Sequence, residues 1–207
     1  MYRKRIGIII SLTAWFAVAG ATTIGAEWVD VGGAVNVDSG ESAIYPALGG
    51  SGDTPYVAFC EMSGGVRQVY VKHWNGSAWV QDGGALNMDT GLHGFHTTID
   101  FIGSTPYVAW QEAESSRKIY VKSFNGSTWS QVGTSYLNED SSREARNPHL
   151  VNVSNVPYVV WDEYFDNIWR RVWVKYWNGS AWTLQGSALN MDLNMATPHP
   201  RMAVYNG

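Results

Sequence analysis

Three acid–base pairs recur along this chain and could together form a binding site. The pairs are Glu61 with Arg67, Glu112 with Arg117, and Glu163 with Arg170. Carboxylates and guanidiniums that converge at one end of a fold could bind sugar hydroxyls, a cation or an anionic substrate. The alternative is that each pair is a cross-strand ion pair, repeated because the surrounding structure is repeated. An exposed pair of that kind contributes only about 0–1 kcal/mol.

The stretch DEYFDNIWRR at 162–171 departs from its counterparts elsewhere in the chain. It carries Tyr164, Phe165 and Trp169, where the first copy reads EMSGGVR at 61–67. Sugars stack their apolar faces on aromatic rings while Asp and Arg bind their hydroxyls, so we expect a ligand here. The alternative is a loop packed on its own structural unit. The predicted ligand-binding residues are Glu163, Tyr164, Phe165, Trp169, Arg170, Glu61, Arg67, Glu112 and Arg117.

No residue is assigned a catalytic role. A catalytic centre is normally asymmetric, with one nucleophile or one acid, whereas the acid–base pairs recur in every copy. A nucleophile elbow that would support Ser-His-Asp catalysis is absent from the sequence. The sequence therefore predicts a chain that is not an enzyme.

The sequence also predicts no metal and no cofactor. Asn-x-Asp recurs at 36–38, 87–89, 138–140 and 190–192. Oxygen ligands with this spacing could help to hold Ca²⁺, but the spacing also fits Asx turns. His93 and His96 share one loop and could meet a ligand or be ordinary solvated histidines; no HExxH spacing supports a metal. Walker-type and dinucleotide-binding glycine patterns are absent.

A repeat of 51 residues supplies the elements that must position these side chains. TPYVAFCE, TPYVAWQE and VPYVVWDE place Tyr56, Tyr107 and Tyr158 at equal intervals of 51 residues. In the first copy we expect short strands near 46–50, 55–60, 67–74 and 78–82. Val, Tyr and Trp dominate these segments, and no helical period occurs. Four strands in about 50 residues predict the blade of a β-propeller, whereas a β-sandwich would not need to repeat its sequence.

The predicted domain, residues 27–207, contains three complete four-stranded antiparallel blades and two partial ones. The blades span about 43–88, 94–137 and 146–190, with partial strands at 27–34 and 198–205. Propellers usually close with four to eight blades. We therefore expect a fragment of a larger propeller, with a homo-oligomer that completes the ring between chains as the alternative.

Residues 1–26 have the pattern of a secretory signal peptide. Arg3, Lys4 and Arg5 precede an apolar run and small residues. This places the chain outside the cytoplasm as a secreted, periplasmic or cell-surface protein, and the membrane is a partner only if the signal is not cleaved. Cleavage would remove three basic residues and move the formal charge from −4 to −7. An acidic surface of this kind argues against nucleic acid as a partner.

The patterns PYVAW and IYVKxWNGSxWxxxG resemble the repeats of secreted bacterial propellers of the kelch and sialidase-like type. YVKHWNGSAW and WVKYWNGSAW also resemble the Trp-rich turn of propeller lectins. The Asp-box turn of sialidases is matched in position at Gly76 and Trp79, although Trp74 stands where the box has Asp. In sialidases this box is a fold element, so the match implies blade architecture and not catalysis.

These observations predict a secreted binding or scaffold module whose leading ligand is a glycan. One alternative is a sialidase-like glycoside hydrolase, which would carry an asymmetric arginine cluster with a Tyr–Glu pair. The other is a structural repeat that binds proteins at the cell surface.

Overall fold

The computed structural model describes residues 30–205, apart from 114–115, 167, 194 and 196. The predicted signal peptide at 1–26 lies outside these residues. The described residues form three four-stranded antiparallel sheets and contain no helix. Consequently, none of them belongs to a helix long and apolar enough to cross a membrane. The predicted all-β class and the four-stranded antiparallel unit are confirmed.

Each sheet is built from four consecutive strands in chain order. The first contains β1 (Ala43–Ser51), β2 (Thr54–Ser63), β3 (Val66–Trp74) and β4 (Trp79–Gln81). The second contains β5 (Gly94–Ile102), β6 (Thr105–Glu112), β7 (Lys118–Phe124) and β8 (Trp129–Gln131). The third contains β9 (Ala145–Val153), β10 (Val156–Tyr164), β11 (Arg170–Trp177) and β12 (Trp182–Leu184).

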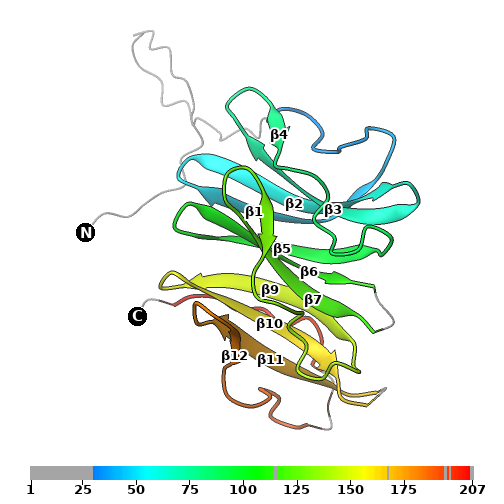
Figure 1. Cartoon of the computed structure of the whole chain (residues 1–207), viewed down its shortest axis with the longest axis vertical. Coiled ribbons are helices and arrows are strands. Elements are labelled where there is room, and N and C mark those ends of the chain that lie inside the picture. Colours follow the sequence, from blue (N-terminus) through cyan, green and yellow to red (C-terminus); the bar gives the residue numbers. More distant parts are fainter. Residues whose placement is uncertain (1–29, 114–115, 167, 194, 196, 206–207) are drawn as a thin grey trace, which may run out of the picture.

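The three sheets stack face to face, with the second between the other two (Figure 1). Contacts between neighbouring sheets are concentrated on the first strands, β1, β5 and β9. Val71 and Trp110 are buried between the first and second sheets, and Ile119 and Trp161 between the second and third. Each sheet thus buries the apolar face of the next, because a single four-stranded sheet would leave that face in water.

The repeated WNGSxW motif forms a turn and a contact between neighbouring repeats. Asn75 Oδ1 accepts hydrogen bonds from the backbone N–H groups of Ser77 and Ala78, each 2.9 Å long. Gly76 has a φ of 97°, which favours glycine. The indole of Trp129 donates to the backbone oxygen of Asp82 across a distance of 2.7 Å. The same contacts recur at the other copies, so the motif has the structural role that its repetition indicates.

The partial strands predicted at 27–34 and 198–205 are not strands in the described residues of those ranges. Their backbone groups bond to side chains instead: Val31 accepts from the Trp79 indole, and Met202 N–H donates to His149 Nδ1. A strand requires a backbone partner beside it, and no described segment supplies one here. Met202 nevertheless packs against the third sheet, on a cluster that contains Val160.

Candidate functional site

The recurring glutamates hold loops of the fold. Glu112 is fully buried, and its Oε2 and Oε1 accept hydrogen bonds from the backbone N–H groups of Met88 and Asp89, at 2.9 and 2.8 Å. The Trp110 indole also donates to Oε2, at 3.0 Å. Glu61 and Glu163 bind the equivalent loops. The carboxylates of Glu61, Glu112 and Glu163 therefore have a structural role in the fold. Glu163 also lines a pocket of about 190 Å³.

The alternative of cross-strand ion pairs is wrong, because each glutamate lies opposite the residue that follows the predicted arginine. Glu61 lies opposite Gln68, and Arg67 lies opposite Met62. Neighbouring residues of a strand point to opposite faces, so Arg67 and Glu61 do not face each other. The same offset places Glu163 opposite Arg171 and not opposite Arg170.

The Asn-x-Asp loops are held by the same kind of contact. Asn87 Oδ1 accepts a hydrogen bond from Val69 N–H, and Asn87 Nδ2 donates to the backbone oxygens of Arg67 and Leu92. Asp89 Oδ1 accepts from Gly91 N–H and closes an Asx turn. Because Asn87 bonds to the first sheet and the next two residues bond to Glu112 of the second, the loop fastens one sheet to the other. This geometry fits the Asx-turn interpretation of the spacing.

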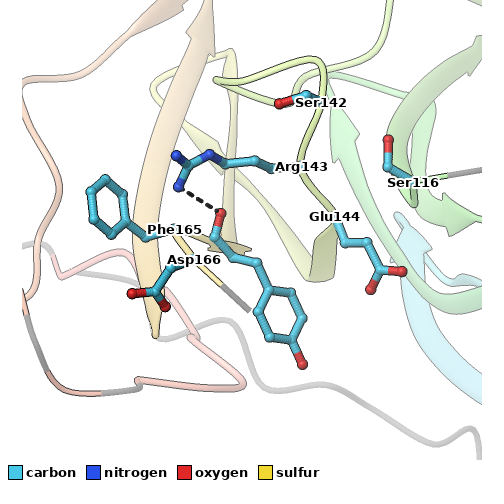
Figure 2. A pocket seen from close by; sticks show the side chains of 7 residues that line it. Ser116, Ser142, Arg143, Glu144, Phe165 and Asp166 are labelled. Carbon is cyan, nitrogen blue, oxygen red and sulfur yellow. Dashed lines mark hydrogen bonds between the residues drawn. The ribbon is translucent and has the colours of Figure 1, made fainter. Parts of the chain in front are cut away.

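An open pocket of about 540 Å³ lies beside the loop between β10 and β11. Its lining consists of Ser116, Ser142, Arg143, Glu144, Tyr164, Phe165 and Asp166 (Figure 2). Two of the predicted aromatic residues, Tyr164 and Phe165, belong to it. Trp169 does not belong to the lining. Its backbone closes the loop through hydrogen bonds with Phe165 and Asp166. A pocket of about 190 Å³ adjoins the same loop and includes Arg171.

Arginines cover the aromatic rings at this end of the sheets. The guanidinium carbons of Arg143 and Arg171 lie 4.6 and 3.3 Å from the centroid of the Phe165 ring. Those of Arg146 and Arg170 lie 5.1 and 4.7 Å from the centroid of the Tyr164 ring. Such contacts are attractive cation–π interactions, so the rings gather positive charge around the pocket.

The predicted residues Arg67, from β3 of the first sheet, and Arg117, which directly precedes β7 of the second, form a similar group at Phe95. Their guanidinium carbons lie 5.4 and 5.3 Å from the centroid of the Phe95 ring. Phe95 and Arg146 occupy equivalent positions, because each is the second residue of its strand, β5 or β9. The residues beside them, His96 and Asn147, both have a positive φ, 50° and 54°, at register irregularities in these strands. Tyr45 has a φ of 53° at the equivalent irregularity of β1, so these bulges belong to the repeat, and they redirect side chains in every copy.

His96 is the histidine of this group with a perturbed pKa. Burial lowers the pKa of its imidazole, and positive charge at His199, Arg117 and Arg201 lowers it further, against the opposing effect of Asp162. The ring is therefore neutral at pH 7 and can accept a proton. Its centroid lies 4.2 Å from that of Tyr45.

Sequence reasoning missed Arg143, Glu144 and Arg146 because it weighed the residues that repeat. The signal was present in SSREAR at 141–146, which stands where the second copy reads TGLHGF. Asp162 is a further residue near the pocket that sequence reasoning did not select. It is fully buried, its Oδ2 accepts a hydrogen bond from Arg170 Nη1 at 3.1 Å, and it stands where the second copy has Gln111.

No protein-family model and no curated protein matches the chain. Among solved structures, it resembles a thermostable family-43 glycoside hydrolase, with a TM-score of 0.53, 14% identity, 77% of this chain covered and 54% of the other. It also resembles an ulvan lyase, a polysaccharide lyase, with a TM-score of 0.52, 12% identity, 75% of this chain covered and 44% of the other. This chain therefore spans about half the length of those proteins. At such low identity the likeness concerns the fold, and it fits the predicted propeller-type stacking of the sheets.

These comparisons overturn the prediction that the chain is not an enzyme. The two solved structures described above are of enzymes, so a blade architecture is no argument against catalysis. The prediction also rested on the symmetry of the repeated glutamates, and these are part of the fold. The pocket beside the β10–β11 loop is asymmetric, because the arginine and the two carboxylates of its lining occur in the third copy alone among the described repeats.

Proposed function

We propose that this chain is part of a carbohydrate-active enzyme and that it binds a polysaccharide at the pocket beside the β10–β11 loop. The observation that carries the proposal is the pairing of Tyr164 and Phe165 with guanidiniums at an open pocket of about 540 Å³. Aromatic faces stack on sugar rings, and guanidiniums and carboxylates bind their polar groups. The likeness to a glycoside hydrolase and a polysaccharide lyase supports the same class of substrate.

Glycoside hydrolysis requires carboxyl groups beside the scissile bond, and the pocket contains Glu144 and Asp166. The Glu144 side chain is 35% exposed and bonded to Arg146. Asp166 accepts hydrogen bonds from two backbone N–H groups of its own loop, which together with the charge of Arg143 lower the pKa of its carboxyl group. Glu144 is thus the carboxylate better placed to meet a sugar. Export by the segment 1–26 belongs to this proposal, because polysaccharides of this kind lie outside the cell.

The test measures binding and cleavage with a panel of neutral and acidic polysaccharides. We expect at least one polysaccharide to retard the chain in an affinity gel and to release reducing ends. Phe165→Ala should weaken the retardation, and Glu144→Gln should reduce cleavage while binding persists. Ser130→Glu, on the exposed middle residue of β8, is the control away from the pocket. If no polysaccharide is bound or cleaved, the proposal is wrong.

A further inference from the structure

Six arginines, drawn from all three sheets and the loops that join their strands, lie against three aromatic rings at one end of the sheets. We call this set the arginine strip, and it consists of Arg67 and Arg117 at Phe95, Arg146 and Arg170 at Tyr164, and Arg143 and Arg171 at Phe165. The whole chain has a formal charge of −4. Cations are therefore concentrated at one end of a chain that is acidic as a whole.

Half of the arginine strip is neutralised within the chain. Arg143 pairs with Asp140 at 2.9 Å, Arg146 with Glu144 at 2.5 Å, and Arg170 with Asp162 at 3.1 Å. Asp166, the other carboxylate of the pocket lining, is in none of these pairs and accepts hydrogen bonds from backbone N–H groups of its own loop.

The other half has no acidic partner in the part of the chain that the structure describes. Arg67, Arg117 and Arg171 form no ion pair there. Arg171 is the most constrained of the three, because its Nε is buried without a hydrogen-bond partner. A buried N–H that lacks an acceptor costs free energy, and the other N–H groups of this guanidinium have no acidic partner in the described residues and can bind a carboxylate or sulfate oxygen.

The layout of the arginine strip favours a ligand longer than one sugar. Phe95 is the second residue of β5, whereas Tyr164 is the last residue of β10 in the next sheet and Phe165 follows it. Stacked sheets lie about 10 Å apart, so a ligand in contact with both groups spans more than a single sugar ring. Two histidines link the groups: His96 follows Phe95 in the chain, and its ring centroid lies 6.4 Å from that of His199. The backbone N–H of His199 donates to Asp162, the partner of Arg170.

We propose that the arginine strip binds the carboxylate or sulfate groups of an acidic polysaccharide, while Phe95, Tyr164 and Phe165 stack on its sugar rings. This inference rests on the proposed function and names its substrate class. Guanidiniums bind both kinds of anion through paired hydrogen bonds, so the shared chemistry is the negatively charged sugar. Arg117 and Arg171 bind the anionic groups of the polysaccharide, because neither forms an ion pair with an acidic side chain in the described residues.

The experiment measures the affinity of the full chain for polygalacturonate, dextran sulfate, dextran and arabinan by isothermal titration. Polygalacturonate carries carboxylates, dextran sulfate carries sulfates, and the other two are neutral. We expect at least one acidic polymer to bind at least about tenfold more tightly than the neutral ones, and Arg117→Gln and Arg171→Gln each to weaken it about tenfold. Ser130→Glu changes the net charge by the same amount on β8 and should leave affinity within about twofold.

Three results would overturn the inference. Equal or tighter binding of dextran or arabinan would show a neutral substrate and leave the proposed function in place. Equally tight binding of polyglutamate would show charge attraction without recognition of sugar rings. Binding of none of the polysaccharides would overturn the proposed function as well. A variant that is weakened and also unfolded, as judged by circular dichroism, is replaced by Arg117→Lys, which keeps the charge, loses the paired geometry and should still weaken binding.

Discussion

Replacement of Glu112 by Gln tests whether the buried glutamates fasten the sheets together. In the structure Oε2 accepts from Met88 N–H and the Trp110 indole, and Oε1 accepts from Asp89 N–H. A glutamine can keep its oxygen at the first position, but its NH₂ group must then face the N–H of Asp89. One charge-assisted hydrogen bond is lost and one buried donor is left without an acceptor. We expect a loss of about 2–3 kcal/mol in the free energy of unfolding.

The measurement is urea unfolding followed by tryptophan fluorescence, combined with amide hydrogen exchange. A loss of this size is a large part of the usual 5–15 kcal/mol, so Glu112→Gln is preferable to alanine. The amide of Asp89 should exchange faster in the variant, while that of Met88 changes less. Glu41→Gln removes the same charge from an exposed residue and should change stability by less than about 0.5 kcal/mol. A Glu112→Gln protein as stable as the Glu41→Gln control would refute the assigned role.

Three further outcomes follow from individual side chains. Burial lowers the pKa values of His96 and His149, so the unfolded chain binds more protons below about pH 6.5, and the free energy of unfolding should fall from pH 7.5 to 5.5. His96→Asn should reduce that fall. An unchanged fall would contradict the lowered pKa of His96. Burial raises the pKa of the Cys60 thiol to about 12, so a thiol reagent should label it only after unfolding. Trp129→Phe keeps an aromatic side chain but loses the indole hydrogen bond to the backbone oxygen of Asp82. Urea unfolding should show a loss of about 1 kcal/mol in the free energy of unfolding.

The repeat predicted the sheets because each strand segment carries its own pattern. The segment expected at 78–82 is the strand Trp79–Gln81, and the segment expected at 55–60 lies within Thr54–Ser63. Strand ends are less well determined by side chains. β2 continues past Glu61 to Ser63, and this extension places Met62 opposite Arg67. A shift of one residue moves a side chain to the other face, so the pairing of Glu61 with Arg67 could not be judged from spacing.

The candidate site was only partly predictable, because three separate segments build it. The aromatic residues of the β10–β11 loop were evident as a departure from the repeat, and Tyr164 and Phe165 line the pocket. Arg143 comes from the loop before β9, and its contact with the Phe165 ring depends on how that loop folds back. The positive φ of His96 left no trace in the sequence, since glycine is the residue that usually marks such a conformation.

Gln111 and Asp162 occupy the same position in successive repeats, and only Asp162 carries a charge. Gln111 Oε1 accepts a hydrogen bond from Asn147 N–H at 2.9 Å, and Asp162 Oδ1 accepts from His199 N–H at 3.2 Å in the next copy. Asp162 therefore performs the task of Gln111, and its second oxygen also binds Arg170. An uncharged residue would meet the structural need but would leave that guanidinium unpaired. The exchange of an amide for a carboxylate thus keeps the link between repeats and fixes one cation of the arginine strip beside the pocket.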